Sequence, residues 1–243
     1  MATAPPFMLN PALDALAIAR RFAGGKRVEI RDLLAGDGAA ALRSHLLARN
    51  DWVLVLNAGA RVFEIPRARF EAMSADQLAT LDALVATEAR HGFQYRYETI
   101  RVPDRPPQSG SEPDLLDRFV EFLSSPPLLD FFRTVTGDGS IDFADGQATS
   151  YSPGHFLTRH DDDVEGKNRK AAYVFGLSAG WRAEYGGLLM FHAADGNIEE
   201  AFTPAMGALR LFAVPAPHSV SFVTPFSPEP RLSVTGWLRG SAL

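Results

Sequence analysis

The 243-residue chain contains no cysteine. This absence excludes disulfide bonds, thiolate-bound zinc, iron–sulfur clusters and a cysteine nucleophile, so any metal would have to be bound by His, Asp or Glu. The chain also lacks an apolar run approaching the ~18 residues that a membrane helix needs. Residues 1–6 do not combine a basic segment with an apolar one, as a secretory signal would. We therefore expect a cytoplasmic protein that does not bind membranes.

Basic residues are also fewer than acidic ones. The chain has 24 Lys and Arg and 29 Asp and Glu, which gives a net charge of −5. This balance argues against a protein that binds nucleic acid by neutralising its phosphates. The hydrophobic share of 46% is enough for one substantial core. We predict a single domain over residues 1–243, while the composition leaves the oligomeric state open.

Helical patterns dominate the first half of the chain, at residues 32–50, 74–90, 113–124 and 127–136. Between them, Phe93, Tyr95 and Tyr97 alternate on one face of a predicted strand, for which we favour core packing over lining a substrate groove. The turn-rich segment 102–113 is the candidate for a loop that closes over substrate.

The second half changes to short β-like runs broken by Gly and Pro, at residues 148–151, 171–177, 188–191, 208–214, 219–223 and 232–238. Many short strands without long helices between them favour an antiparallel sandwich or barrel. We predict an α+β fold with a mainly β core. In it, a double-stranded β-helix (jelly roll) at about 141–243 is braced by the helices and strand of about 1–140.

Four of the six histidines lie in this β-rich half. His160 and Asp162 are two residues apart, and on a strand this spacing places both side chains on one face. Two histidines and one carboxylate form the facial triad of non-haem iron sites, so a third ligand would come from a distant strand. His218 is preferred over His192 for this place. The simpler alternative is that the pair lies in a solvated turn within the acidic run 161–165.

Arg231 and Ser233 follow His218 and again have strand spacing. A guanidinium and a hydroxyl on one face can bind a carboxylate, the guanidinium through a bidentate fork. A buried arginine beside a metal site needs an anion, and a dicarboxylate cosubstrate would supply it. His155 is expected to satisfy a local hydrogen bond, and Trp237 is expected in the core.

The segment from about residue 128 to 240 resembles the prolyl-hydroxylase branch of the 2-oxoglutarate- and Fe(II)-dependent dioxygenases, and in particular relatives of the ribosomal-protein prolyl hydroxylases. The resemblance rests on Tyr151-Ser-Pro-Gly154-His-Phe-Leu157-Thr-Arg-His160-Asp-Asp162, on Tyr185-Gly-Gly187, on His218 and on Arg231-Leu-Ser-Val-Thr-Gly-Trp237. It implies that His160, Asp162 and His218 bind the iron.

The same resemblance implies that Arg231 pairs with the distal carboxylate of 2-oxoglutarate, with Ser233 in support. Tyr151 and Tyr173 would be hydrogen-bonding neighbours of this cosubstrate. Many prolyl hydroxylases carry tyrosine where this chain has Leu157. This chain therefore has no phenol at position 157, and we expect Tyr151 and Tyr173 to make the phenol contacts with the cosubstrate.

The activity implied by the resemblance is hydroxylation of proline in a protein or peptide. It would use Fe(II), 2-oxoglutarate and O2, with ascorbate as an accessory reductant, and would convert 2-oxoglutarate to succinate. Hydroxylation of a free amino acid or small metabolite is the alternative within this chemistry. A non-catalytic or cupin-like metal-binding jelly roll is the alternative from another class.

Overall fold

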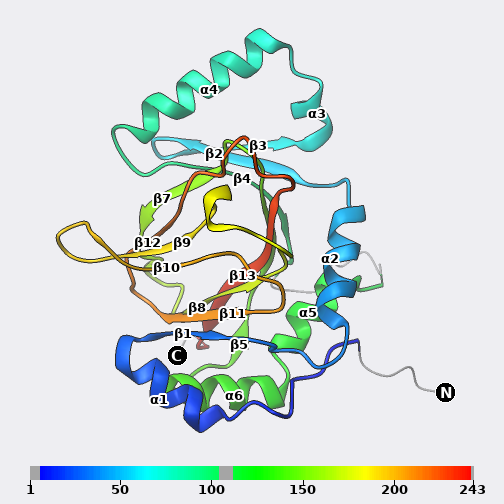
Figure 1. Cartoon of the computed structure of the whole chain (residues 1–243), viewed down its shortest axis with the longest axis vertical. Helices are drawn as coiled ribbons and strands as arrows, with labels where there is room; N and C mark the ends of the chain where they lie inside the picture. Colours follow the sequence, from blue (N-terminus) through cyan, green and yellow to red (C-terminus); the bar gives the residue numbers. More distant parts are fainter. Residues whose placement is uncertain (1–5, 104–111, 242–243) are drawn as a thin grey trace.

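A single curled antiparallel sheet forms the centre of the computed structural model, which describes residues 6–103 and 112–241 (Figure 1). The longest path of neighbouring strands is β1-β11-β8-β13-β6-β4-β7-β12-β9-β10. In addition, β2 pairs with β3 and β4, and β5 pairs with β13. The strands are β1 (Arg27–Ile30), β2 (Val53–Ala58), β3 (Arg61–Pro66), β4 (Tyr95–Arg101), β5 (Phe143–Ala144), β6 (Gln147–Tyr151), β7 (Phe156–His160), β8 (Arg169–Gly176), β9 (Leu189–His192), β10 (Ile198–Phe202), β11 (Leu209–Ala213), β12 (His218–Val220) and β13 (Arg231–Arg239).

Helices pack around this sheet on several sides (Figure 1). They are α1 (Ala15–Gly25), α2 (Gly38–Ala48), α3 (Arg67–Glu71), α4 (Ala75–Ala89), α5 (Leu115–Leu123) and α6 (Pro126–Thr136), with a 3-10 turn at Ala183–Tyr185. The predicted α+β fold with a mainly β, jelly-roll core braced by helices is confirmed. None of the described helices is long and apolar enough to cross a membrane.

The largest hydrophobic cluster lies between the helices and the sheet. Phe119 of α5 is fully buried and contacts Phe175 of β8, with ring centroids 4.9 Å apart. Leu128 and Phe132 of α6 and Phe22 of α1 join the same cluster. These helices therefore support the sheet from outside and leave its inner surface for the site described below.

The prediction that helices dominate the first half is confirmed by α1 to α6, and the strand predicted around Phe93, Tyr95 and Tyr97 is present as β4. The strands β1, β2 and β3 were not predicted, and they join the same sheet as the C-terminal strands. The helix expected over 32–50 begins only at Gly38. Before it, Asp32 (φ 52°) and Gly36 (φ 71°) adopt left-handed conformations that a right-handed helix cannot contain. The other expected helices are present, and α4 begins with the predicted capping box of Ser74 and Gln77.

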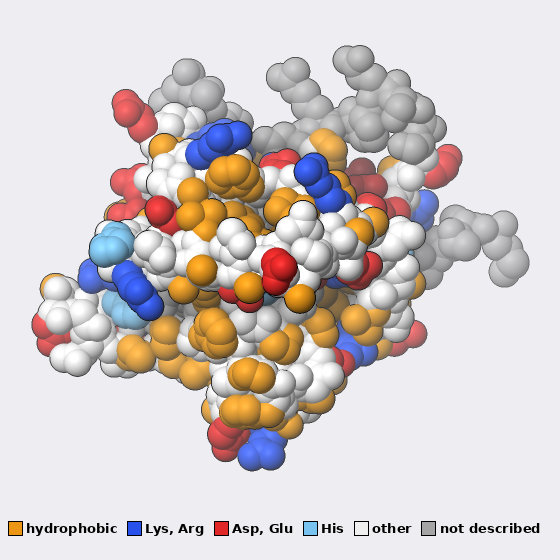
Figure 2. Space-filling view, turned by 90° about the horizontal axis from the view of Figure 1, so that it is seen from above, with side chains coloured by type: hydrophobic (Ala, Val, Ile, Leu, Met, Phe, Trp, Pro, Cys, Tyr) orange, Lys and Arg blue, Asp and Glu red, His pale blue; other side chains and the backbone are white. Residues whose placement is uncertain are grey.

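The six β-like runs of the second half correspond to β6, β8, β9, β11, β12 and β13. The segment 102–113, expected to be a loop over the substrate, falls largely on residues 104–111, which lie outside the described residues. On the face formed by α3 and α4, lysine and arginine side chains are scattered among acidic and apolar ones and form no continuous basic patch (Figure 2).

Candidate metal centre

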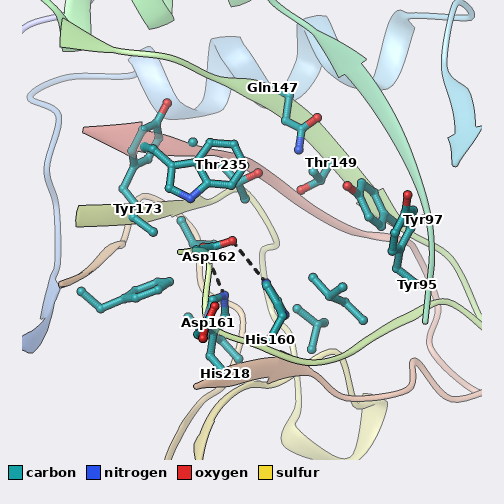
Figure 3. A pocket seen from close by; sticks show the side chains of 18 of the residues that line it. Tyr95, Tyr97, Gln147, Thr149, His160, Asp161, Asp162, Tyr173, His218 and Thr235 are labelled. Carbon is teal, nitrogen blue, oxygen red and sulfur yellow. Dashed lines mark ion pairs between the residues drawn. The ribbon is translucent and has the colours of Figure 1, made fainter. Parts of the chain in front are cut away.

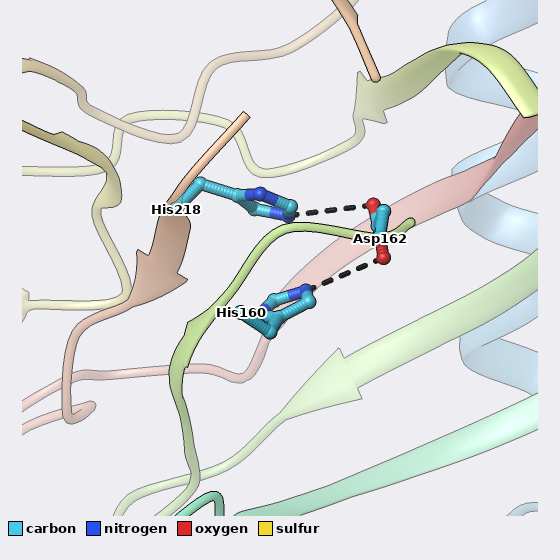
Figure 4. A group of neighbouring side chains, drawn as sticks. All are labelled: His160, Asp162 and His218. Atoms are coloured by element: carbon cyan, nitrogen blue, oxygen red, sulfur yellow. Dashed lines mark ion pairs between the residues drawn. The ribbon is translucent and has the colours of Figure 1, made fainter. Parts of the chain in front are cut away.

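Two imidazoles and one carboxylate meet on the inner side of the curled sheet. His160 ends β7, and His218, the first residue of β12, is its antiparallel partner. Nε2 of His160 lies 3.5 Å from one carboxylate oxygen of Asp162, and Nε2 of His218 lies 3.6 Å from the other (Figure 4). Among the described residues this is the only group whose potential metal-ligand atoms all lie within 4.8 Å of one another.

The other ring nitrogen of each histidine faces a backbone carbonyl. Nδ1 of His160 is 3.0 Å from the carbonyl oxygen of Thr158, and Nδ1 of His218 is 2.8 Å from that of Ala216. A carbonyl only accepts, so each Nδ1 carries the hydrogen and each Nε2 keeps a free lone pair. Burial and the neighbouring His160 lower the pKa of His218, which keeps this imidazole neutral. Two imidazoles beside a carboxylate are a donor set that suits Fe(II).

The strand argument that linked His160 to Asp162 is wrong, although both residues do reach the same site. Strand β7 ends at His160, and Asp162 has a left-handed backbone with φ 65°. Asp162 therefore reaches the two imidazoles from a turn that follows β7 and not from the strand itself. Asp161 and Asp163 are exposed and also line this cavity.

His192, the rival for the third ligand, lies at the end of β9 and outside this group. Its Nε2 is 2.7 Å from the hydroxyl oxygen of Ser219. The side chains of Ser219 and His218 lie on opposite faces of β12 because side chains alternate along a strand. His192 therefore lies on the outer side of β12, the strand that carries His218.

Arg231 lies in the same cavity of about 470 Å³ as the three potential ligands. It is the first residue of β13, is 3% exposed, and its guanidinium is 4.9 Å from the ring centre of Tyr151. Burial lowers the pKa of Arg231 to about 10, so the group is still charged at pH 7. Within the described part of the chain, Arg231 forms no ion pair with a carboxylate, and a buried cation without one favours an anionic ligand.

Gly187 makes the position of Arg231 sterically feasible. A Cβ atom at Gly187 would lie 2.9 Å from Cδ of Arg231, and the residue has φ +64°. At Gly186, a Cβ would lie 2.0 Å from the carbonyl oxygen of Phe222. The Tyr185-Gly-Gly187 sequence is thus a turn that passes close to the arginine, which only glycine permits.

Tyr151 and Tyr173 both line the cavity and are buried. Burial raises the pKa of each phenol well above 10, so both remain protonated. The hydroxyl of Tyr173 donates to the carbonyl of Asp145 at 2.7 Å, which leaves its oxygen able to accept but not to donate. Ser233 lies behind the cavity wall, with its hydroxyl 2.9 Å from that of Thr149, which does line the cavity.

The aromatic residues Phe93, Tyr95 and Tyr97 line this cavity, so the preferred interpretation of core packing is wrong for Phe93 and Tyr95, whereas Tyr97 also packs against a buried hydrophobic cluster. Figure 3 shows Tyr95 and Tyr97 side by side in the cavity. Their rings follow one another at centroid distances of 5.5 and 5.7 Å, and Tyr97 stacks on Tyr151 at 5.1 Å. Phe93, at the outer end, is 48% exposed and lies 5.6 Å from the ring of His160. The row extends from the surface to the inner tyrosine beside Arg231.

Sequence reasoning missed several residues of the cavity. Trp237, expected in the core, lines it, and its even spacing from Arg231 along β13 was a signal that could have placed it there. Leu157, in contrast, was expected beside the cosubstrate, and it does line the cavity, where it forms an apolar wall together with Val220, its partner on β12. Arg169, the first residue of β8, had no such signal because it follows an irregular loop.

His155 is 3% exposed and accepts a hydrogen bond at Nδ1 from the backbone N–H of Ser152, as the predicted local role requires. Burial, reinforced by the positive charge of Arg96, lowers the pKa of His155 to about 4. In the unfolded chain the pKa would be near 6.5, so between pH 6.5 and 4 the unfolded state binds more protons and stability falls as the pH falls.

We expect this single group to remove about 3 kcal/mol of unfolding free energy between pH 6.5 and pH 4. The measurement is urea unfolding across this range for the unmodified protein and for His155→Asn, whose amide oxygen can still accept from Ser152. The variant should show a correspondingly flatter pH dependence. Parallel curves for the two proteins would contradict the buried, neutral state of His155.

Residues 146–239 match the family described as the 2OG-Fe(II) oxygenase superfamily. These residues include the three potential metal ligands and Arg231. This part of the chain is therefore similar to the 2OG-Fe(II) oxygenase superfamily. Members of this superfamily use Fe(II), 2-oxoglutarate and O2, and the His160, Asp162 and His218 group suits the metal.

The chain is 34% identical over 137 residues to the prolyl 3,4-dihydroxylase OGFOD1 of Ostreococcus tauri, and the aligned residues are 51% of the chain. The aligned region is only 26% of that relative's length. The resemblance to the prolyl-hydroxylase branch that the sequence suggested is confirmed by this match.

Two solved structures share the fold. A prolyl-4-hydroxylase of Pseudomonas putida superposes with a TM-score of 0.59 at 20% identity, covering 94% of this chain and 100% of the other. A prolyl hydroxylase of Trichoplax adhaerens, in complex with a peptide of the hypoxia inducible factor, gives a TM-score of 0.60 at 14% identity, covering 93% and 89%. At these identities the likeness establishes the fold alone.

Proposed function

We propose that this chain is a 2-oxoglutarate- and Fe(II)-dependent hydroxylase, folded as one domain, that acts on proline in a protein or peptide. The observation that carries the proposal is the cavity in which His160, Asp162 and His218 converge beside Arg231, which is buried and forms no ion pair with a carboxylate of the described residues. A metal-binding jelly roll without this cosubstrate would gain nothing from burying a cation there.

His160, Asp162 and His218 would hold the iron. Arg231 would bind the distal carboxylate of 2-oxoglutarate through its guanidinium fork, with Tyr151 as a neighbouring hydrogen-bond donor. Bound iron supplies the oxidising chemistry that couples decarboxylation of 2-oxoglutarate to hydroxylation of a C–H bond. The chain's own contribution is to hold the cosubstrate in register and, with the apolar side chains of Leu157 and Val220, to restrict water.

The substrate class is inferred from the cavity wall and from the relatives. The row of Phe93, Tyr95 and Tyr97 runs outward from the inner tyrosine to a half-exposed phenylalanine. Aromatic-lined grooves suit proline-containing segments in extended conformations. A curated relative named as a prolyl 3,4-dihydroxylase supports the same residue as the target.

The test is a turnover assay on the purified protein loaded with Fe(II) under argon and then exposed to air. We expect succinate to form from 2-oxoglutarate slowly without a second substrate and faster when the substrate is present. Mass spectrometry of candidate proteins, treated with and without 2-oxoglutarate, should show a gain of about 16 Da on a prolyl residue, one oxygen atom in mass.

Absence of succinate under all these conditions would contradict the proposed chemistry. Succinate formation with modification of free proline or another small metabolite, and of no protein, would instead support the small-molecule alternative. Apo protein treated identically is the control.

A further inference from the structure

Arg169 lies in the cavity but is neither one of the three potential metal ligands nor the proposed partner of the cosubstrate carboxylate. Its Nη1 donates to the backbone carbonyl oxygen of Asp162 at 2.9 Å and lies 3.9 Å from a carboxylate oxygen of the same residue. The guanidinium carbon is 3.5 Å from the ring centre of Trp237 on β13. The side chain is only 14% exposed, so these contacts are made in a largely dry environment.

Asp162 needs such a contact because its conformation is unusual. A φ of 65° is sparsely populated by residues other than glycine, and Asp162 lies outside any strand that would hold it. The chain from Asp161 to Asn168 joins β7 to β8 as an irregular, largely exposed segment. Relaxation of Asp162 to another backbone conformation would change the direction of its carboxylate relative to the two imidazoles.

We propose that Arg169 is a positioning residue that holds the left-handed backbone of Asp162, and so directs the carboxylate at His160 and His218. This inference rests on the proposed function of those three side chains as iron ligands. The hydrogen bond fixes the carbonyl of Asp162, while stacking on Trp237 fixes the guanidinium. A lysine could supply the charge but not the flat face that stacks, so it would replace Arg169 only in part.

Arg239 provides a matched control. It is the partner of Arg169 in the pairing of β13 with β8 and is similarly buried, at 16% exposure. It stacks on Phe143 at 4.9 Å, donates to the carbonyl of Lys167 and forms an ion pair with Asp145. These contacts of Arg239 are thus of the same kind as those of Arg169, but none of them is made with Asp162.

The experiment measures binding of Co²⁺ to apo protein by calorimetry, the visible absorption spectrum of the Co²⁺ form, and the Tm of the apo protein. We expect Arg169→Ala to weaken Co²⁺ binding by about 10- to 100-fold and to change the spectrum, as loss of a contact behind a metal ligand does. Arg169→Lys should restore part of the affinity. Arg239→Ala should lower the Tm while leaving Co²⁺ affinity and spectrum unchanged.

Co²⁺ binding by Arg169→Ala with unchanged affinity and spectrum would overturn the inference while leaving the proposed function intact. Failure of the unmodified protein to bind Co²⁺ would instead contradict the proposed metal site itself. If Arg169→Ala does not fold, Arg169→Lys decides, because unaltered affinity and spectrum in that variant would show that stacking and the fork geometry are not needed.

Discussion

Replacement of His160 by alanine is expected to abolish Fe(II) binding and 2-oxoglutarate turnover while the protein stays folded. The substitution removes one of three ligand atoms and leaves Asp162 and His218 too few to retain the metal at micromolar concentrations. The fold should persist because His160 is at the end of β7 and outside the hydrophobic clusters. Calorimetric titration with Fe(II) under argon, succinate assay and circular dichroism measure the three quantities.

His192→Ala is the matched control, since this histidine also ends a strand but bonds to Ser219 on the outer side of β12. It should keep metal binding and turnover. Loss of both in His192→Ala with their retention in His160→Ala would exchange the two assignments. If both variants still bind Fe(II), the metal binds at another site.

Replacement of Arg231 by alanine is expected to raise the 2-oxoglutarate concentration needed for half-maximal turnover by at least about 30-fold. Removal of one partner from a buried, hydrogen-bonded charge pair costs roughly 2–5 kcal/mol, and each 1.4 kcal/mol corresponds to about a tenfold change in affinity. Arg231→Lys should recover only part of the loss, because an ammonium cannot form the bidentate fork.

The assay is succinate formation against 2-oxoglutarate concentration, together with equilibrium binding of 2-oxoglutarate to the Co²⁺-loaded protein. Arg210→Met serves as control, because Arg210 is equally buried on β11 but already pairs with Glu29 at 2.8 Å. This variant should be less stable yet keep the 2-oxoglutarate requirement. An unchanged requirement in Arg231→Ala would favour a metal-binding jelly roll that does not use this cosubstrate.

Much of the site could be predicted from the residues, but part of the reasoning was wrong. His160, Asp162 and His218 do converge, yet Asp162 reaches the site through a left-handed turn rather than along a strand. Residue types and spacing could not reveal this turn, because aspartate is compatible with either conformation and the contact from Arg169 that accompanies it comes from the next strand.

The position of Phe93, Tyr95 and Tyr97 could also be predicted only in part from the sequence. Alternation placed Phe93, Tyr95 and Tyr97 on one face, and the structure agrees. Whether that face met the hydrophobic core or a cavity depended on which strands β4 would pair with, namely β6 and β7. Pairing between segments so distant in the chain leaves no local trace in the residue pattern.

The sequence by itself determined the helix starts marked by caps, the strands marked by alternation, the absence of cysteine chemistry and the identity of the few side chains able to bind a metal. Tertiary structure decided that His218 lies opposite His160, that Arg231 is buried without a carboxylate partner among the residues at 6–103 and 112–241, and that Arg169 contacts Asp162. The physical reason is that caps and alternation arise from neighbours in the chain. Strand register and burial arise only when distant strands pair and exclude water between them.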